Sequence, residues 1–380
     1  MTTISDFDLI ESKLRADGVA PAFDFLIQKF QSEGNYGQLF QTRLLRKRLE
    51  LGIPLVQREF FEGLLPEQKK AYEESFIQAA REAGELFLES GDLPRAWSYY
   101  RVIGETQPIV AALDGIEEHD NMAAIIEIAF QEQVHPRKGF ELILKHYGIC
   151  RAISSVYQYP NREGREECVK LLVRTLYADL AANLKRTIAQ QEPDFPDSNQ
   201  ISHLLQGRDW LFENNCYYID TSHVSSVVQY SLELSEPEIL AMVLDLADYG
   251  SRLGPMFQNI GNPPFEQFRD YVFYFKALLG QEVDQCVEHF RTKMLQSDPD
   301  EVGTVPAQVL VALLARLERF DEAIAISLER LKNADPNQLA CPTLHQLCQW
   351  GKQFYTLREV SKEQGDLINF TAALLQEESR

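Results

Sequence analysis

The sequence predicts an all-α protein, because apolar residues recur at the helical period along most of the chain and strand patterns are nearly absent. Cys168, Leu172, Leu176, Leu180 and Leu184 stand four residues apart, as one buried helix face requires. No Asn-Gly or Asp-Gly turn separates two β-branched runs, so the sequence gives no sign of a hairpin.

Two long helices carry the clearest pattern, one within residues 68–90 and one within 165–191. Ser235 with Glu238, and Thr356 with Glu359, have the spacing of capping boxes and predict two further helix starts. Proline, glycine and asparagine cluster between the helical stretches, at 135–139, 159–164, 190–200, 249–268 and 296–307. The break at 190–200 predicts two domains, a helical array over 1–189 and a second over 200–380.

Charge and composition limit the partners and the compartment. The chain has 57 acidic and 37 basic residues, a formal charge of -20 that repels phosphate backbones and anionic bilayers. We therefore expect neither nucleic acid nor membrane as a partner. The N-terminus carries acids where a signal peptide has basic residues, and no apolar run approaches the ~20 residues of a membrane span. Six scattered cysteines without a C-x-x-C pair suit reduced thiols, so we expect a cytoplasmic protein.

One segment carries a family resemblance. In residues 80–108 a small residue, an aromatic, a turn glycine, an alanine, a second aromatic and a closing proline stand at family-like offsets: Gly84, Phe87, Gly91, Ala96, Tyr100 and Pro108. The segment resembles a tetratricopeptide repeat (TPR), and looser relatives occur around 274–300 and 312–337. The resemblance implies a TPR-like α-solenoid of antiparallel helix pairs with irregular repeats, whose concave face binds a protein or peptide. The matching positions are packing residues, so the resemblance assigns no ligand contact.

The function predicted from these features is binding or scaffolding rather than catalysis. The sequence contains no G-x-S-x-G, P-loop, G-x-G-x-x-G or H-E-x-x-H signature. We expect a protein or peptide partner and no cofactor.

The polar stretch NNCYYIDTSHVSSVVQYS, residues 214–231, is the best candidate for a binding site, through Tyr217, Tyr218, Asp220 and His223. The simpler interpretation is a corner between helices. A helix over 202–216 would then end near Asn214 and Asn215, one of Asp220, Thr221 and Ser222 would cap the next helix, and valines would form its buried side.

A metal site is the alternative function. His146, Cys150, Asp220 and His223 together offer a tetrahedral set of ligands, which would make the protein a metal-dependent or metal-stabilised helical enzyme of unknown reaction. Cys341, His345 and Cys348 have one-face helical spacing, but Leu344 and Leu347 flank them, and we interpret this stripe as core.

Overall fold

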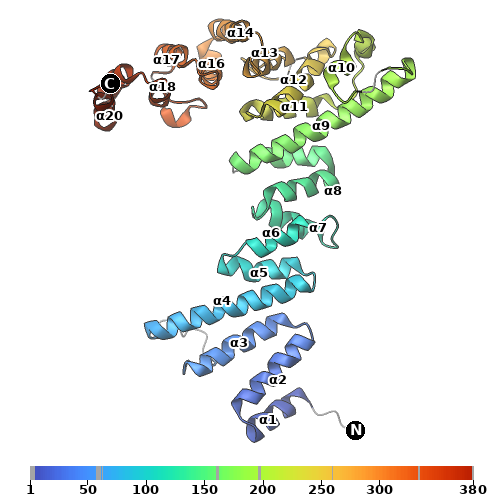
Figure 1. The fold of residues 1–380 in the computed structure, drawn as a ribbon, viewed down its shortest axis with the longest axis vertical. Helices are drawn as coiled ribbons and strands as arrows, with labels where there is room; N and C mark the ends of the chain where they lie inside the picture. The colour runs from blue at the N-terminus through green and yellow to red at the C-terminus, as the bar shows by residue number, and fades with distance from the viewer. Residues whose placement is uncertain are drawn as a thin grey trace. The chain divides into compact units, whose positions relative to one another are not determined.

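The computed structural model describes residues 5–56, 61, 63–159, 162–195, 198–258, 260–332 and 334–378 (Figure 1). The prediction of an all-α protein is confirmed: helices make up 75% of the chain, and the described residues contain no strand. No helix among them is both long and apolar enough to cross a membrane.

The chain forms two compact units, Met1–Tyr147 and Gly148–Arg380. The predicted domains, 1–189 and 200–380, stay a prediction. Segment 190–200 belongs to the second unit, where the preceding helix, α9 (Arg162–Gln191), packs on the helices that follow it. The boundary between the units falls within α8 (Pro136–Tyr157), at the non-helical Gly148 with φ 76° and ψ 177°. A positive φ of this kind has a low cost only for glycine.

The first unit is built from helices that pack against their neighbours in sequence. Its elements before α8 are α1 (Asp6–Ala16), α2 (Val19–Ser32), α3 (Tyr36–Glu50), α4 (Pro66–Glu89), α5 (Leu93–Ile103), α6 (Gln107–Asp114), α7 (Met122–Ile126) and the π-helix η1 (Glu127–Gln131).

A close contact within the first unit joins α4 and α5, the two helices of the TPR-like segment. A Cβ on Gly84 of α4 would lie 2.7 Å from Cε2 of Tyr100 on α5, so only glycine lets the two helices come this close. The connection turns at Gly91, with φ 80°, and Asp92 begins α5 by accepting a hydrogen bond from the Arg95 amide at 3.1 Å. Ala96 of α5 is fully buried against this contact.

The second unit contains the larger set of helices. After α8 and α9 come α10 (Ile201–Leu205), η2 (Asp209–Asn215), α11 (Thr221–Tyr230), η3 (Ser231–Glu233), α12 (Pro237–Ser251), η4 (Pro255–Phe257), α13 (Phe268–Leu278), α14 (Val283–Gln296), α15 (Pro299–Val302), α16 (Val305–Arg316), α17 (Phe320–Ile326), η5 (Ser327–Leu331), η6 (Pro336–Gln338), α18 (Leu344–Trp350), α19 (Phe354–Gln364) and α20 (Leu367–Glu378).

Helix α9 organises the start of the second unit. The predicted stripe from Cys168 to Leu184 is confirmed, since all five of its residues are completely buried. Helix α9 packs on α10, α11 and α12. From α12 onward the helices pack in chain order, with α16 packing directly on α14. At the contact between α12 and α13, a Cβ on Gly250 would lie 2.4 Å from Cδ1 of Phe268.

Both predicted capping boxes are wrong. Helix α12 starts later than Ser235 because Pro237, with its fixed φ and no amide hydrogen, occupies the first helical position. The partner residue, Glu238, forms an ion pair with Arg174 at 3.1 Å. Helix α19 starts earlier than expected, at Phe354, so Thr356 lies inside its first turn.

The stripe predicted at Cys341, His345 and Cys348 is only partly helical. Helix α18 begins at Leu344 and is capped by Thr343, so Cys341 precedes it. Both cysteines are buried, as a core interpretation requires, and burial raises the pKa of each thiol to about 11.

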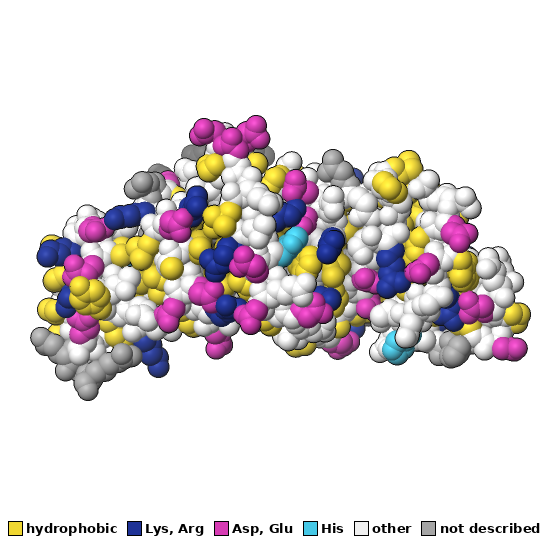
Figure 2. Space-filling model, turned by 90° about the horizontal axis from the view of Figure 1, so that it is seen from above, with side chains coloured by type: hydrophobic (Ala, Val, Ile, Leu, Met, Phe, Trp, Pro, Cys, Tyr) yellow, Lys and Arg dark blue, Asp and Glu magenta, His cyan; other side chains and the backbone are white. Residues whose placement is uncertain are grey.

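Charged side chains of both signs lie interspersed over the visible face of the molecule (Figure 2). Ion pairs of the second unit include Arg208 with Glu192 at 2.8 Å and Arg252 with Asp248 at 3.0 Å.

Candidate functional site

The candidate stretch 214–231 is a corner between η2 and α11, as the simpler interpretation predicts. Asn214 and Asn215 both adopt left-handed conformations, with φ 56° and 59°, which asparagine tolerates better than most residues. Asp220 is the cap of α11 and accepts hydrogen bonds from the amide and the hydroxyl of Ser222, at 2.9 and 2.7 Å. These hydrogen bonds lower the pKa of the Asp220 carboxyl, so it stays ionised at neutral pH.

The helix predicted over 202–216 is wrong. The chain forms the short α10 and the 3-10 helix η2 instead, and they are separated at Gly207, which has φ 70°. The Arg208 guanidinium donates hydrogen bonds to the carbonyls of His203 and Leu204, at 3.3 and 3.1 Å, and so satisfies the carbonyls at the end of α10.

The corner borders an open hollow of about 560 Å³, here called the tyrosine groove. Residues 217–221 form one side of it, α9 contributes Asn183, Arg186 and Thr187, and Phe257 closes it from η4. The groove is thus lined by both predicted tyrosines, by Asp220, and by residues far away in the sequence.

The two tyrosines have different environments. The Tyr218 hydroxyl donates to the Leu211 carbonyl at 2.7 Å, its amide donates to the Tyr249 hydroxyl at 2.8 Å, and its carbonyl accepts from Asn183 at 2.8 Å. Burial raises the pKa of the Tyr218 phenol. Tyr217 is 56% exposed, and its ring meets Phe257 edge to face at 5.5 Å. Tyr218 therefore anchors the corner, while the Tyr217 ring is exposed in the groove.

His223 meets one of the other predicted residues. Its Nε2 lies 3.1 Å from Sγ of Cys150 on α8, and both residues belong to the second unit. Cys150 is exposed, and His223 is held in the first turn of α11.

The four-residue metal set finds no support among the described residues, which include no group of three or more His, Cys, Asp and Glu side chains able to hold a metal. His146 belongs to the first unit, and its Nε2 lies 3.1 Å from the Glu117 carbonyl oxygen. The Asp220 carboxylate accepts from Ser222. The pair of Cys150 and His223 is what remains of the predicted cluster.

The Cys150–His223 pair predicts a reactive thiol. An imidazole nitrogen at 3.1 Å can take up the proton that the thiol releases as its sulfur attacks an electrophile. We expect iodoacetamide at neutral pH to alkylate Cys150 severalfold faster than Cys216, the other exposed cysteine. The His223→Gln variant should slow Cys150 and leave Cys216 unchanged. Timed alkylation followed by mass spectrometry of the two peptides gives both rates, and equal rates in the unmodified chain would contradict the prediction.

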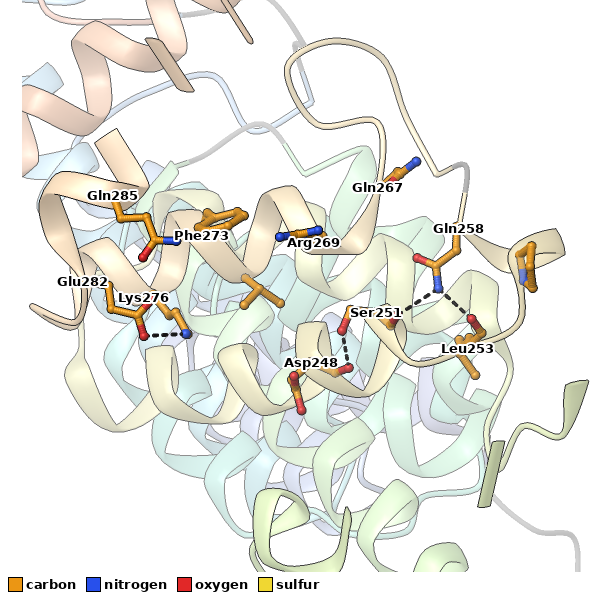
Figure 3. A pocket seen from close by; sticks show the side chains of 12 residues that line it. Asp248, Ser251, Leu253, Gln258, Gln267, Arg269, Phe273, Lys276, Glu282 and Gln285 are labelled. Carbon is orange, nitrogen blue, oxygen red and sulfur yellow. Dashed lines mark hydrogen bonds and ion pairs between the residues drawn. The ribbon is translucent and has the colours of Figure 1, made fainter. Parts of the chain in front are cut away.

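A second hollow, of about 720 Å³, lies between the end of α12, η4, α13 and the start of α14; we call it the arginine hollow (Figure 3). Its charges are mostly paired, Lys276 with Glu282 at 3.0 Å and Asp248 with Arg252 at 3.0 Å. Arg269 has no carboxylate partner among the described residues, and its guanidinium lies 5.5 Å from the centre of the Phe273 ring.

The segment 252–258 borders both hollows. Phe257 lines the tyrosine groove, whereas Pro255 and Gln258 line the arginine hollow. The Gln258 amide donates to the carbonyls of residues 250, 251 and 253, at 3.1, 3.2 and 2.7 Å, and two of these bonds are drawn in Figure 3. Met256 stands between Pro255 and Phe257 in the sequence and is 74% exposed.

Sequence reasoning did not identify Arg186, Phe257 or Arg269 as site residues. Arg186 stands on the polar side of an amphipathic helix, where one basic residue looks like another. The available signal was the length of the 249–268 break, which exceeds the roughly 12–15 residues of most loops without a function.

Comparison of the chain with protein-family models, with curated proteins and with solved structures finds no match.

Proposed function

We propose that this chain is a cytoplasmic protein-binding or scaffolding protein, a TPR-like array of helix pairs that holds a segment of a partner protein on its concave surface. Three features support the array: helices that pack in chain order, the close contact of Gly84 with Tyr100, and the turn at Gly91. The free cysteines agree with a reducing compartment.

The observation that carries the binding function is the exposed ring of Tyr217 in the tyrosine groove. The hydrogen bonds of Tyr218 fix the backbone next to Tyr217. The Tyr217 residue therefore loses little conformational entropy when a partner binds. Aromatic rings held in this way contribute strongly to protein interfaces, since they bury a large area at a low entropic cost.

We expect peptides selected from a random displayed library against the full chain to depend on this ring. The Tyr217→Ala variant should weaken binding of the enriched peptides by about tenfold or more, the loss typical of a central aromatic contact. Fluorescence polarisation of labelled peptides measures it.

The matched control is Tyr157→Ala, which removes an exposed tyrosine of the same unit that lines neither hollow. Its affinity should equal that of the unmodified chain. A library that yields no peptide above background, or peptides that bind both variants equally, would contradict the proposed function.

A further inference from the structure

The tyrosine groove contains a guanidinium without a partner. Arg186 is exposed on α9 and forms no hydrogen bond or ion pair within the described part of the chain. Its helix neighbour Arg174 pairs with Glu238 at 3.1 Å, as expected in a chain with a charge of -20. The one carboxylate that lines the groove, Asp220, is already compensated by Ser222 and by the N-terminus of α11.

The arginine hollow repeats this arrangement. Its two acids are neutralised by Arg252 and Lys276, so the Arg269 charge is the one left uncompensated among its lining residues. Figure 3 shows Arg269 and Phe273 side by side on α13. The exposed amide of Gln285 is a further hydrogen-bond donor in the hollow.

A hydrogen-bonded network around the buried Asp270 holds the Phe273 ring beside Arg269. The Phe273 ring stacks on His289 with centroids 4.2 Å apart, and His289 Nε2 lies 2.8 Å from the carboxylate of the buried Asp270. A guanidinium held over a fixed ring keeps its donor edge free for two parallel hydrogen bonds to a carboxylate.

The exposed Met256 of η4 follows Pro255, which lines the arginine hollow, and precedes Phe257, which lines the tyrosine groove. Methionine is common on surfaces that accept varied partners, because its flexible thioether adapts to different apolar side chains. A segment that crosses η4 would contact it on the way from one arginine to the other.

We propose that the partner is an acidic peptide segment that occupies both hollows, with one carboxylate on Arg186, one on Arg269 and an apolar side chain over Met256. This inference rests on the proposed function and adds the chemistry of the partner. A long polyanion such as nucleic acid would meet the repulsion of the -20 net charge along its whole length, whereas a segment with two carboxylates places its negative charge only at the two arginines.

The experiment uses the full chain, peptides from the displayed library and three charge reversals. Enriched peptides should carry acidic residues on both sides of an apolar one. Arg186→Glu and Arg269→Glu should each weaken the same peptide by about tenfold or more, and the double variant should weaken it further. Raising NaCl from about 0.05 to about 0.3 M should weaken binding to the unmodified chain.

The matched control is Arg174→Glu, which makes the same change in charge on α9, about 18 Å along the helix from Arg186. It should leave affinity within twofold, with circular dichroism confirming that every variant is folded. Two results would overturn this inference and leave the proposed function standing. One is that the peptides depend on Tyr217 but contain no acidic residues. The other is that only one of the two charge reversals, at Arg186 or at Arg269, lowers their affinity. An oligonucleotide that binds as tightly through both arginines would overturn the peptide class. A failure to enrich any peptide would overturn both.

Discussion

Replacing Asp270 by alanine is expected to lower the free energy of unfolding by about 3 kcal/mol, because it removes the centre of a buried ionic network. The carboxylate is 2% exposed. It accepts hydrogen bonds from the amides of Glu266 and Gln267 at 3.0 and 2.9 Å, and it lies 2.8 Å from His289 Nε2 and 3.1 Å from Lys293 Nζ. The substitution leaves the two amides and the His289 nitrogen without this acceptor, and Lys293 keeps its ion pair with Glu266 at 2.6 Å.

The matched control is Asp284→Ala. Asp284 also pairs with a cation, Arg319 at 2.6 Å, but its side chain is 93% exposed, so we expect no measurable change in stability. Urea unfolding followed by circular dichroism gives the free energy for each variant. Equal stability of the Asp270 and Asp284 variants would show that the buried network does not contribute.

The same carboxyl predicts a pH dependence. Burial alone would raise the pKa of Asp270, but hydrogen bonds from His289, Gln267 and Lys293 outweigh burial and lower it. A carboxyl with a lowered pKa stabilises the fold above its unfolded value of roughly 3.9, and this contribution is lost as the pH falls toward the folded value. Unfolding free energies measured from pH 6 down to about pH 3 should therefore decline less steeply for Asp270→Ala than for the unmodified chain.

Replacing Gly250 by alanine is the second change with a large expected effect. The new Cβ would lie 2.4 Å from a ring carbon of the fully buried Phe268, which has no space to move away. We expect a loss of about 2 kcal/mol from overpacking, larger than the ~1 kcal/mol that alanine gains over glycine in a helix.

Gly115→Ala provides the control, since the nearest atom to its new Cβ would be 3.9 Å away and its φ of −81° suits any residue. Its stability should stay the same or rise slightly. Thermal unfolding of both variants is a sufficient measurement. If Gly250→Ala were as stable as the unmodified chain, the contact between α12 and α13 would have to be more adaptable than the structure indicates.

The sequence was sufficient to predict the helices with one strong apolar stripe, and α9 follows its stripe residue by residue. Helix starts were harder to predict where the determinant is remote in sequence. The residue preceding α19, Gln353, donates a hydrogen bond to Asp321 at 2.7 Å, and a capping pattern read from neighbouring residues cannot include that contact. The break of the 202–216 helix depends on Gly207, whose positive φ is common at helix ends.

The candidate site was predictable only in part, because it is assembled from separate segments. The polarity of the corner marked Tyr217 and Asp220, and both line the groove. Nothing in the local sequence relates Arg186 on α9 or Phe257 on η4 to them, since that relation exists only after the helices pack. The approach of Cys150 to His223 is of the same kind, as 73 residues separate them.

The segment 252–258 has a consequence for the shape of the two hollows. It supplies Phe257 to one hollow and Pro255 and Gln258 to the other, and Gly254 packs so closely on Asn215 that a Cβ there would lie 2.0 Å from the amide oxygen. An insertion or substitution in this one segment would therefore reshape both hollows together and leave the helices beneath them in place. Under the proposed function, exchanging this single short segment would therefore change which ligands bind while the helical framework stays unchanged.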